Sequence, residues 1–493
     1  MSETAALDPE EILDQADLKA AVPAGPDAKK KSKFDPSITE GPLTRAVWKI
    51  AWPAVLTNLV SGAQGWVDQI LVGNLIGYQA NAAIGVGFQI FLVVIVFVSS
   101  IFIGMSVLVA RFAGARDSEK VNRTVYQGFL TAAFMSLGIL APIGYFAAPH
   151  LLGFVTSDPD VMTEALPFLR IMFTCSFGML IYFMLSGSLR SAGDARTPMV
   201  LGVTMNVLNV IFNVILIRGL GPIPAFGTAG SAMGTCLASG PVGVYSLYKL
   251  WNGSWVVSFP RSGYAPNWKV IRQLFKFGLP AGIQGIAMNV GGVIMAAFMG
   301  SLAMGKATQA VYAVAYSQLF LLVTWSSNAL MGASASVAGQ NMGAGKPDRA
   351  VAAVRTAASF GLAGAVVVGL FFFFIPQQLL AIFGMTDPEV VAIGTELLRV
   401  LSISGLFISM ALAYTGGLQG TGDTKSPLFI SIISQVLLPV GICFVIQRLI
   451  GLEPIHIWLA ILAGHFTRFL LSIIRFNQQR WRSIKVDIDT TQA

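Results

Sequence analysis

Long apolar runs, separated by short polar segments, recur along the chain from about residue 46 to residue 477. Each run is at least about as long as the roughly 20 residues that a helix needs to cross a bilayer. The runs are mostly uniform in hydrophobicity, whereas the strands of an outer-membrane barrel alternate between apolar and polar positions. The pattern predicts an all-α membrane protein with twelve transmembrane helices. We place them near 46–76, 81–111, 122–148, 163–190, 197–218, 228–250, 270–302, 308–339, 350–376, 392–419, 427–448 and 455–477.

The composition supports this prediction, because 55% of the residues are hydrophobic and only 11% are charged. A soluble domain carries about 25% charged residues. The net charge is +8, but Lys and Arg gather in every second connection between the runs. This distribution fits a topological bias and not nucleic-acid binding. We therefore expect a multi-pass protein of a bacterial-type inner (plasma) membrane, with both termini in the cytoplasm and no nucleic-acid partner.

The start of the chain differs from the rest. Residues 1–43 combine Pro, Gly, acidic residues and a run of lysines, a composition that predicts a disordered cytoplasmic arm. The remaining parts are expected to be an N-lobe with helices 1–6 at 44–250, a cytoplasmic linker at 251–269, a C-lobe with helices 7–12 at 270–480, and a C-terminal tail at 481–493.

An internal repeat relates the two halves. The segment LRSAGDARTP at 189–198 returns as LQGTGDTKSP at 418–427, 229 positions later. In the first helix of each half, Pro53 and Pro280 are 227 positions apart. With six helices per half, both halves begin on the same side of the membrane. The repeat therefore predicts two six-helix bundles related by a pseudo-two-fold axis along the membrane normal, an arrangement typical of alternating-access transporters.

The repeated segments have a structural explanation. Gly193 and Gly422 suit a turn that ends a helix. The residues after each glycine can cap the next helix, and Pro198 and Pro427 fit its first turn. We interpret these loops as hinges that fix pairs of helices, not as a binding site.

One acidic residue, Asp68, lies deep in an apolar run, and no other Asp or Glu does. An isolated acid there costs about 2.5–3.5 kcal/mol on insertion scales and usually faces a polar interior. Asn206, Asn209 and Asn213 are spaced three and four apart, so they share one face of the fifth helix. The position that matches Asp68 in the second half is Met295, so the acid belongs to the first half alone.

Two kinds of role fit this group. The carboxyl can bind a proton, or it can hold a hard cation such as Na⁺ together with amide oxygens. Alternatively, Asp68 hydrogen-bonds its neighbours, and the asparagines only join helices, as small polar residues often do in membranes. Because coupling residues lie in the first half, we expect the second half to supply more of the apolar contacts to a substrate.

The chain resembles the MATE (multidrug and toxic compound extrusion) family. Each half carries a Gly-Asp-x-x-x-Pro loop after its fourth helix, and the first helix has a P…N…VDxxxVG pattern at Pro53, Asn58, Asp68 and Gly73. The match covers roughly residues 45 to 480. The resemblance implies a cation-coupled antiporter that exports organic compounds, often cationic and amphipathic, with Asp68 as the site of the coupling cation or proton.

The resemblance also implies partners for Asp68. In a bacterial subgroup resembling DinF, the acid works with an Asn and an Asp in the fifth helix, which match Asn209 and Asn213 here, so the second acid is replaced. In the NorM-like subgroup, acids in the seventh and tenth helices take part. Neither helix has an acid past its first turn here, and Asn289 is the polar stand-in, which is also a candidate for the lining of a central cavity.

Four further residues are candidates for the lining of a central cavity. Gln89 and Gln318 occupy matching positions in the two halves. His465 is a titratable residue within the twelfth helix. Met295 shares a face of the seventh helix with other methionines, and such polarizable side chains suit promiscuous binding. Helix packing explains the two glutamines equally well and is favoured for the methionines, and His465 is also a candidate for a second proton site.

We therefore predict a secondary antiporter that exchanges H⁺ or Na⁺ for a small organic compound, acts as a monomer in the bilayer and needs no cofactor. H⁺ is favoured as the coupling ion, because one carboxylate among amides offers few charged oxygen ligands for Na⁺. The alternative is a flippase for a lipid-linked saccharide or another amphipathic lipid, which would need a basic cavity. An enzyme is disfavoured because the three histidines form no catalytic or metal-binding motif. A channel is disfavoured because no segment is typical of a selectivity filter.

Overall fold

The computed structural model describes residues 33–156 and 158–486, so most of the predicted N-terminal arm and the end of the predicted tail lie outside the described residues. Each of the twelve predicted runs corresponds to one helix or to consecutive helices. Their bounds are α3 Leu43–Leu75; α4 Tyr78–Gly114; α5 Ser118–Ala133, η1 Phe134–Leu140 and α6 Ala141–Val155; α7 Pro159–Thr174 and α8 Phe177–Ser191; α9 Arg196–Arg218; α10 Gly227–Trp251; α11 Trp268–Gly300; α12 Gly305–Val314, η2 Ala315–Leu319 and α13 Leu321–Gly343; α14 Pro347–Phe374; α16 Pro388–Thr421; α17 Lys425–Ser431, η3 Ile432–Leu437 and α18 Leu438–Leu449; and α19 Pro454–Asn477. Short helices are α2 Ser37–Glu40, α15 Pro376–Ile382 and η4 Arg480–Ser483.

Most of these segments are apolar enough to span a bilayer. Within the described part of the chain, nine helices have the necessary length and hydropathy, and the pair α7–α8, bent by 52°, makes ten. The helices α3 and α10 have the length but are more polar. Several of their polar side chains line a cavity inside the protein, which explains why these two spans tolerate them.

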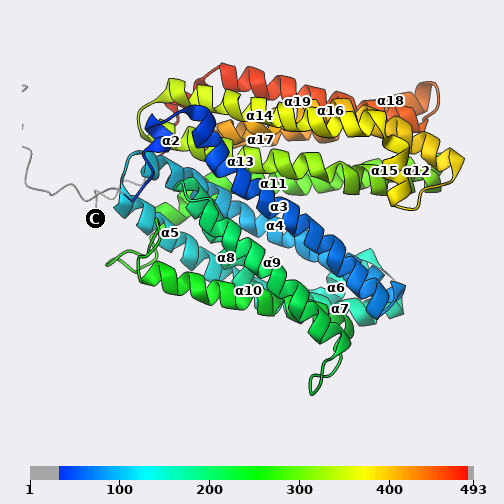
Figure 1. Ribbon diagram of the computed structural model, residues 1–493, viewed down its shortest axis with the longest axis horizontal. Helices are drawn as coiled ribbons and strands as arrows, with labels where there is room; N and C mark the ends of the chain where they lie inside the picture. The colour runs from blue at the N-terminus through cyan, green and yellow to red at the C-terminus, as the bar shows by residue number, and fades with distance from the viewer. Residues whose placement is uncertain (1–32, 157, 487–493) are drawn as a thin grey trace, which may run out of the picture. The chain divides into compact units, whose positions relative to one another are not determined.

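The twelve spans form two six-helix bundles, α3–α10 and α11–α19. In Figure 1, α14, α16 and α19 lie together in the upper part, α8, α9 and α10 lie in the lower part, and α3, α4, α11 and α13 lie between them. Across the boundary, α3 packs on α13, and α4 packs on both α11 and α13. The first span of each bundle therefore lies close to the other bundle.

The repeated loops adopt the same conformation in both bundles. Gly193 and Gly422 have positive φ angles of 101° and 100° at the end of a helix. In both loops the aspartate that follows accepts a hydrogen bond from the backbone N–H three residues later, at 3.0 Å for Asp194 and 3.2 Å for Asp423. These contacts confirm the prediction that the loops end one helix and cap the next.

The backbones of the two bundles are in direct contact where α4 and α13 end. A Cβ on Gly114 would lie 1.9 Å from the carbonyl oxygen of Gln340, and a Cβ on Gly343 would lie 1.9 Å from that of Arg111. Only glycine permits such backbone contact. This end of the molecule is the one that the distribution of basic residues assigns to the cytoplasm.

The segment before α3 is packed, so the prediction of a disordered arm up to residue 43 is wrong for residues 34–43. Phe34 is 5% exposed and Ile38 is fully buried. Asn341 donates to the carbonyl oxygen of Ile38 at 3.3 Å, and Arg116 pairs with Glu40 at 2.6 Å. The two apolar side chains of this otherwise polar segment fasten it to both bundles.

The residues after α19 are packed as well. Trp481 is fully buried, stacks on Phe476 at 5.1 Å between ring centroids and donates its indole N–H to the carbonyl oxygen of that residue. Arg111, from the first bundle, donates to the carbonyl oxygen of Ile484 at 3.2 Å. The predicted tail therefore joins the folded structure through residue 486.

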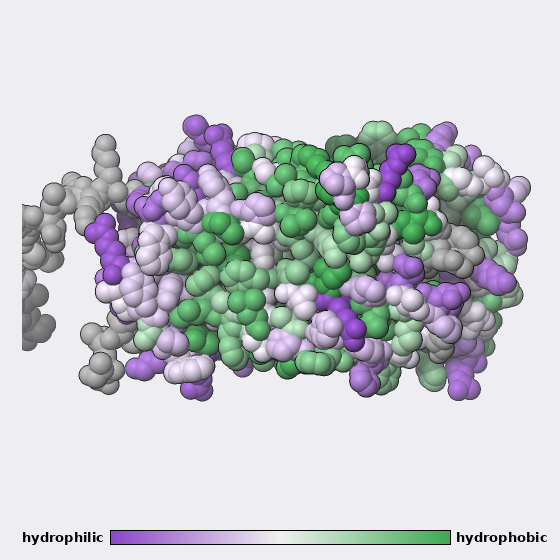
Figure 2. Space-filling model, turned by 90° about the horizontal axis from the view of Figure 1, so that it is seen from below, coloured by the Kyte–Doolittle hydropathy of each residue, from purple (hydrophilic) through white to green (hydrophobic). Residues whose placement is uncertain are grey.

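The surface of the molecule fits a lipid environment. Figure 2 shows hydrophobic residues over much of the middle of the visible face and hydrophilic residues gathered mainly toward its two ends. Large apolar side chains such as Phe146, Val293 and Phe374 are between 67% and 74% exposed. In water such exposure would be costly, whereas lipid tails accept it.

Candidate functional site

A cavity of about 510 Å³ lies between α3, α4, α7, α8, α9 and α10 of the first bundle and the η2–α13 region of the second. Its wall is mainly apolar, with side chains such as Phe88, Phe168 and Met179, and its polar groups come chiefly from α3, α9 and α10. Most of the wall belongs to the first bundle. The expectation that the second half supplies more of the apolar contacts is therefore wrong for this cavity.

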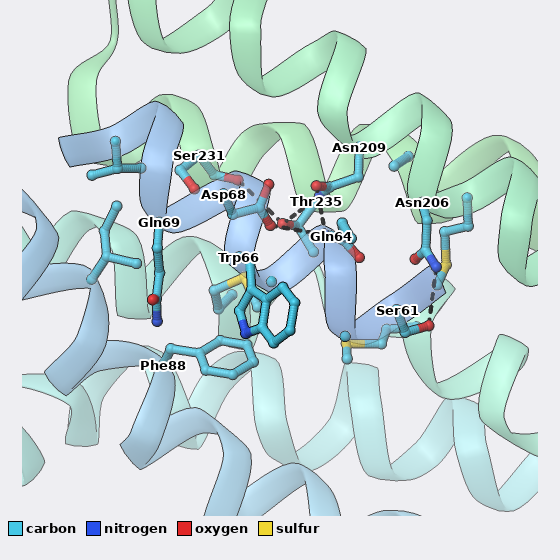
Figure 3. Close-up of a pocket in the computed structure, with 18 of the residues that line it drawn as sticks. Ser61, Gln64, Trp66, Asp68, Gln69, Phe88, Asn206, Asn209, Ser231 and Thr235 are labelled. Atoms are coloured by element: carbon cyan, nitrogen blue, oxygen red, sulfur yellow. Dashed lines mark hydrogen bonds between the residues drawn. The ribbon is translucent and has the colours of Figure 1, made fainter. Parts of the chain in front are cut away.

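Two polar stripes face each other in the wall of this cavity, as Figure 3 shows in part. The stripes consist of Ser61, Gln64 and Asp68 on α3 and of Asn206, Asn209 and Asn213 on α9. Each stripe has the spacing of three and four residues that places side chains on one helix face. The hydrogen bonds run from Asn206 to Ser61 at 3.0 Å, from Gln64 to Asn209 at 2.7 Å, and from Asn213 to Asp68 at 2.9 Å. The structure thus brings Asp68 and the three predicted asparagines together in one register.

The carboxylate of Asp68 is partly buried and is held by amides alone. Its Oδ1 accepts from Asn213 at 2.9 Å, and its Oδ2 accepts from Gln64 at 2.8 Å. No Lys, Arg or His of the described residues lies within ion-pair distance of it. Nor do three His, Cys, Asp or Glu side chains of the described part come together as a metal site. The negative charge therefore lacks a cationic partner, which makes the carboxyl an acceptor for a proton or a cation.

The amide network continues into α10. Asn213 donates to Asn209 at 3.1 Å, and Asn209 donates to the hydroxyl of Thr235 at 2.9 Å. The side-chain oxygen of Asn213 is buried without a hydrogen-bond partner among the described residues. A Cβ on Gly234 would lie only 2.0 Å from that oxygen. The absence of a side chain at Gly234 thus makes room for the amide that contacts Asp68.

A second set of contacts ties the cavity to the second bundle. The indole N–H of Trp66 donates to Gln318 at 2.6 Å, and the side chain of Asn58 donates to the carbonyl oxygen of Trp325 at 3.0 Å. The ring of Trp325 fits against Gly62, where a Cβ would lie 1.9 Å from it. Any movement of the second bundle relative to α3 would therefore break contacts within about three turns of Asp68.

The structure separates the remaining predicted residues from this cavity, although Gln318 lies at its wall. Gln89 is exposed on α4. Asn289 is also exposed and donates to the carbonyl oxygen of Gly285 on its own helix. Met295 and His465, 4% and 3% exposed, are packed inside the second bundle. The prediction that these four residues line a cavity fails for this cavity, because Gln89 and Asn289 are exposed outside its wall and the other two are packed in the core of the second bundle.

Sequence reasoning missed Ser61, Gln64, Trp66, Thr235 and Gly234. Ser61 and Gln64 could have been found, because with Asp68 they repeat the three-and-four spacing of the asparagines. Trp66, Thr235 and Gly234 carry no comparable signal, since their importance depends on which helices touch.

Known proteins similar to this chain cover nearly all of it. The probable multidrug resistance protein NorM of Thermotoga maritima is 23% identical over 436 residues, 88% of this chain and 92% of that protein. The probable multidrug resistance protein YoeA of Bacillus subtilis is 25% identical over 460 residues, 92% of this chain and 98% of that protein. The multidrug resistance protein MdtK of Edwardsiella ictaluri is 24% identical over 451 residues, 89% of this chain and 95% of that protein.

Solved structures share the fold. An outward-facing conformation of a multidrug resistance MATE family transporter superposes with a TM-score of 0.84, at 20% identity, over 92% of this chain and 100% of that one. A MOP superfamily transporter from Pyrococcus furiosus gives a TM-score of 0.83, at 20% identity, over 93% of this chain and 100% of that one. The MatE family model matches residues 53–215 and 280–445, which begin 227 positions apart as the two halves of the repeat do. The chain therefore belongs to the MatE family.

Proposed function

We propose that this protein is a secondary antiporter that exports small organic compounds in exchange for H⁺ or Na⁺, with Asp68 as the coupling site. One observation carries the proposal: a carboxylate with no basic partner among the described residues lies in the wall of a largely apolar cavity. An unpaired charged side chain at membrane depth is costly, and such residues usually mark a substrate or ion pathway. The names of the relatives as multidrug resistance proteins support the export of drug-like compounds.

The chemistry of the cavity favours an amphipathic, often cationic, substrate. Aromatic and methionine side chains such as Phe88, Phe168 and Met172 supply apolar contacts that tolerate varied shapes. The residues that line the cavity include no Lys, Arg or His. A flippase for an anionic lipid-linked saccharide would need such groups, so the cavity favours the exporter.

Alternating access would couple the binding of the cation to the release of the organic substrate. In the proposed cycle a cation from outside binds at Asp68, weakens substrate binding and releases the substrate outward. The protein then reorients, releases the cation into the cytoplasm and binds new substrate. The cation must bind the two orientations differently, since a ligand with equal affinity for both would drive nothing. The contacts of Gly62 and Asn58 with Trp325 would couple α3 to that reorientation, because they join α3 to the second bundle.

Transport by the full chain in proteoliposomes tests this function. A fluorescent cationic dye is followed under a pH gradient alone, a Na⁺ gradient alone, and no gradient. The proposal expects dye movement against its own gradient under at least one of the first two conditions. Dye movement under neither gradient, or equal movement without any gradient, would contradict it.

A further inference from the structure

One face of α19 inside the second bundle carries polar groups that have no partner. The face consists of Trp458, His465, Arg468 and Ser472, whose spacing of seven, three and four residues puts them in line. Each of them is at most 3% exposed. The indole N–H of Trp458, both ring nitrogens of His465, Nε of Arg468 and the hydroxyl of Ser472 have no hydrogen-bond partner among the described residues.

Neighbouring segments add polar groups to this face. Gln435, in the π-helical segment η3, has a buried amide nitrogen without a partner among the described residues, and this nitrogen lies 3.4 Å from the position that a Cβ would take on Gly464 of α19. Tyr316, in the π-helical segment η2, lies close enough to Arg468 for the two to interact electrostatically. Phe320 closes one side, with its ring 5.9 Å from that of His465. Two of these neighbours lie in π-helical turns, which often mark functional sites in membrane and soluble proteins.

The guanidinium of Arg468 is the group that most needs a partner. No carboxylate of the described residues lies within ion-pair distance of it. On the same helix, two turns further on, Arg475 pairs with Asp423 at 2.8 Å. That carboxylate is therefore already occupied. A buried arginine is normally paired, because the cost of removing its charge from water is large.

From this arrangement we infer that the second bundle holds a binding site for one anionic group, contacted by Arg468 and flanked by His465, Tyr316 and Gln435. The group is a small inorganic anion or the carboxylate of an organic compound. Arginine binds both through charge-assisted hydrogen bonds. The polar groups named around it are neutral or positive, and none of them is an acid that would repel an anion.

The inferred site is separate from the cavity that contains Asp68. Gln318 in η2 lies at that cavity, whereas Tyr316, two residues earlier, does not line it and lies within electrostatic range of Arg468. One π-helical segment thus stands between an acidic site in the first bundle and a basic site in the second. The inference concerns binding in the second bundle and does not depend on cation-coupled export.

Thermal unfolding of the purified full-length protein tests the site. The chain contains 9 tryptophans, so intrinsic fluorescence reports unfolding. The protein is kept in sodium methanesulfonate, whose anion is neither a small inorganic ion nor a carboxylate, and is titrated at constant ionic strength with sodium chloride or sodium benzoate. We expect a saturable rise of the unfolding temperature with at least one of these anions, because a ligand that binds the folded state stabilises it. A response to chloride alone identifies a free anion as the ligand, and a response to benzoate alone identifies an organic carboxylate.

Substitutions locate the response. Arg468→Gln should abolish the rise, whereas Arg448→Gln, at an exposed arginine of α18, should retain it. Asp68→Asn should retain it too, which separates this site from the proposed coupling site. If Arg468→Gln does not yield folded protein, Tyr316→Phe and Ser472→Ala should shift the half-saturating concentration at least threefold. No saturable rise in the wild-type protein, or an identical rise in Arg468→Gln, would overturn the inference.

Discussion

Gly234→Ala probes the carboxylate site without altering any polar group in it. The added Cβ would lie 2.0 Å from the side-chain oxygen of Asn213 and 3.1 Å from its backbone nitrogen. Real Cβ atoms do not come so close to oxygen, so the amide must move. Since the nitrogen of the same amide donates to Asp68 at 2.9 Å, its displacement breaks or weakens that hydrogen bond.

The size of the effect follows from this geometry. Losing a hydrogen bond to a charged group costs about 1.5–3 kcal/mol. At about 1.4 kcal/mol per factor of ten, the loss corresponds to roughly a 10- to 100-fold change in an equilibrium that depends on that bond. Overpacking adds about 1–3 kcal/mol of destabilisation. Replacing glycine by alanine inside a helix gains up to about 1 kcal/mol, which partly offsets the loss of stability.

Gly243→Ala is the matched control, because Gly243 lies inside the same helix and the nearest atom to the position of its added Cβ is 3.5 Å away, an ordinary contact distance. Both variants replace a glycine in the interior of one helix, so their difference isolates the clash with Asn213. Gradient-driven dye transport in proteoliposomes should fall about 10- to 100-fold in Gly234→Ala and stay within about twofold of wild type in Gly243→Ala. Equal transport by the two variants, with both folded, would refute the role of Asn213 at Asp68.

Two further substitutions test other parts of the structure. Gly62→Ala places a Cβ 1.9 Å from the ring of Trp325 and should lower the free energy of unfolding by about 1–3 kcal/mol. Gly65→Ala, which has open space around its added Cβ, should cause no such loss. Similar unfolding temperatures for the two variants would contradict the contact between Gly62 and Trp325. Burial raises the pKa of Asp35. Hydrogen bonds, led by the one from Lys49, lower this pKa by more than burial raises it, so the pKa lies below its usual value of 3.8. The pair therefore stabilises the folded state above pH 3.8 and stops doing so as the pH falls through the lower folded pKa. At pH 7, Asp35→Asn should lower the unfolding temperature slightly, by the equivalent of about 0.2–1 kcal/mol. At a pH below the folded pKa of Asp35, the variant and the wild-type protein should unfold at the same temperature. A difference that persists at that low pH would contradict a stabilising Asp35–Lys49 pair.

The order of the helices could be predicted from the sequence because an apolar run of bilayer length has few structures other than a helix. The repeat predicted the two bundles and the conformations of Gly193 and Gly422 in the same way. The packing of Ile38 and Trp481 could not be predicted. Each is a single apolar residue in a polar segment, and its burial depends on surfaces that only the assembled bundles create.

The site was predictable where a spacing carried the information. Asp68 and the asparagines of α9 were found because they break the apolar pattern at helical intervals. Gln318 was found through the repeat. Gly234 could not be found, since a glycine in a glycine-rich helix has no distinguishing pattern, and its function appears only when α10 packs on Asn213. The lack of a carboxylate partner for Arg468 among the described residues could not be predicted either, because it depends on which side chains surround this residue in the folded protein.

Whether Asp68 couples a cation to export is best decided by Asp68→Asn. Asp160→Asn, at an exposed acid of the same bundle, is the control. The two variants and the wild-type protein are compared for dye binding in detergent and for dye transport driven by a pH or a Na⁺ gradient. We expect Asp68→Asn to bind dye but to lose gradient-driven transport, while Asp160→Asn keeps both. Gradient-driven transport by Asp68→Asn at the wild-type rate would mean that Asp68 is not the coupling site.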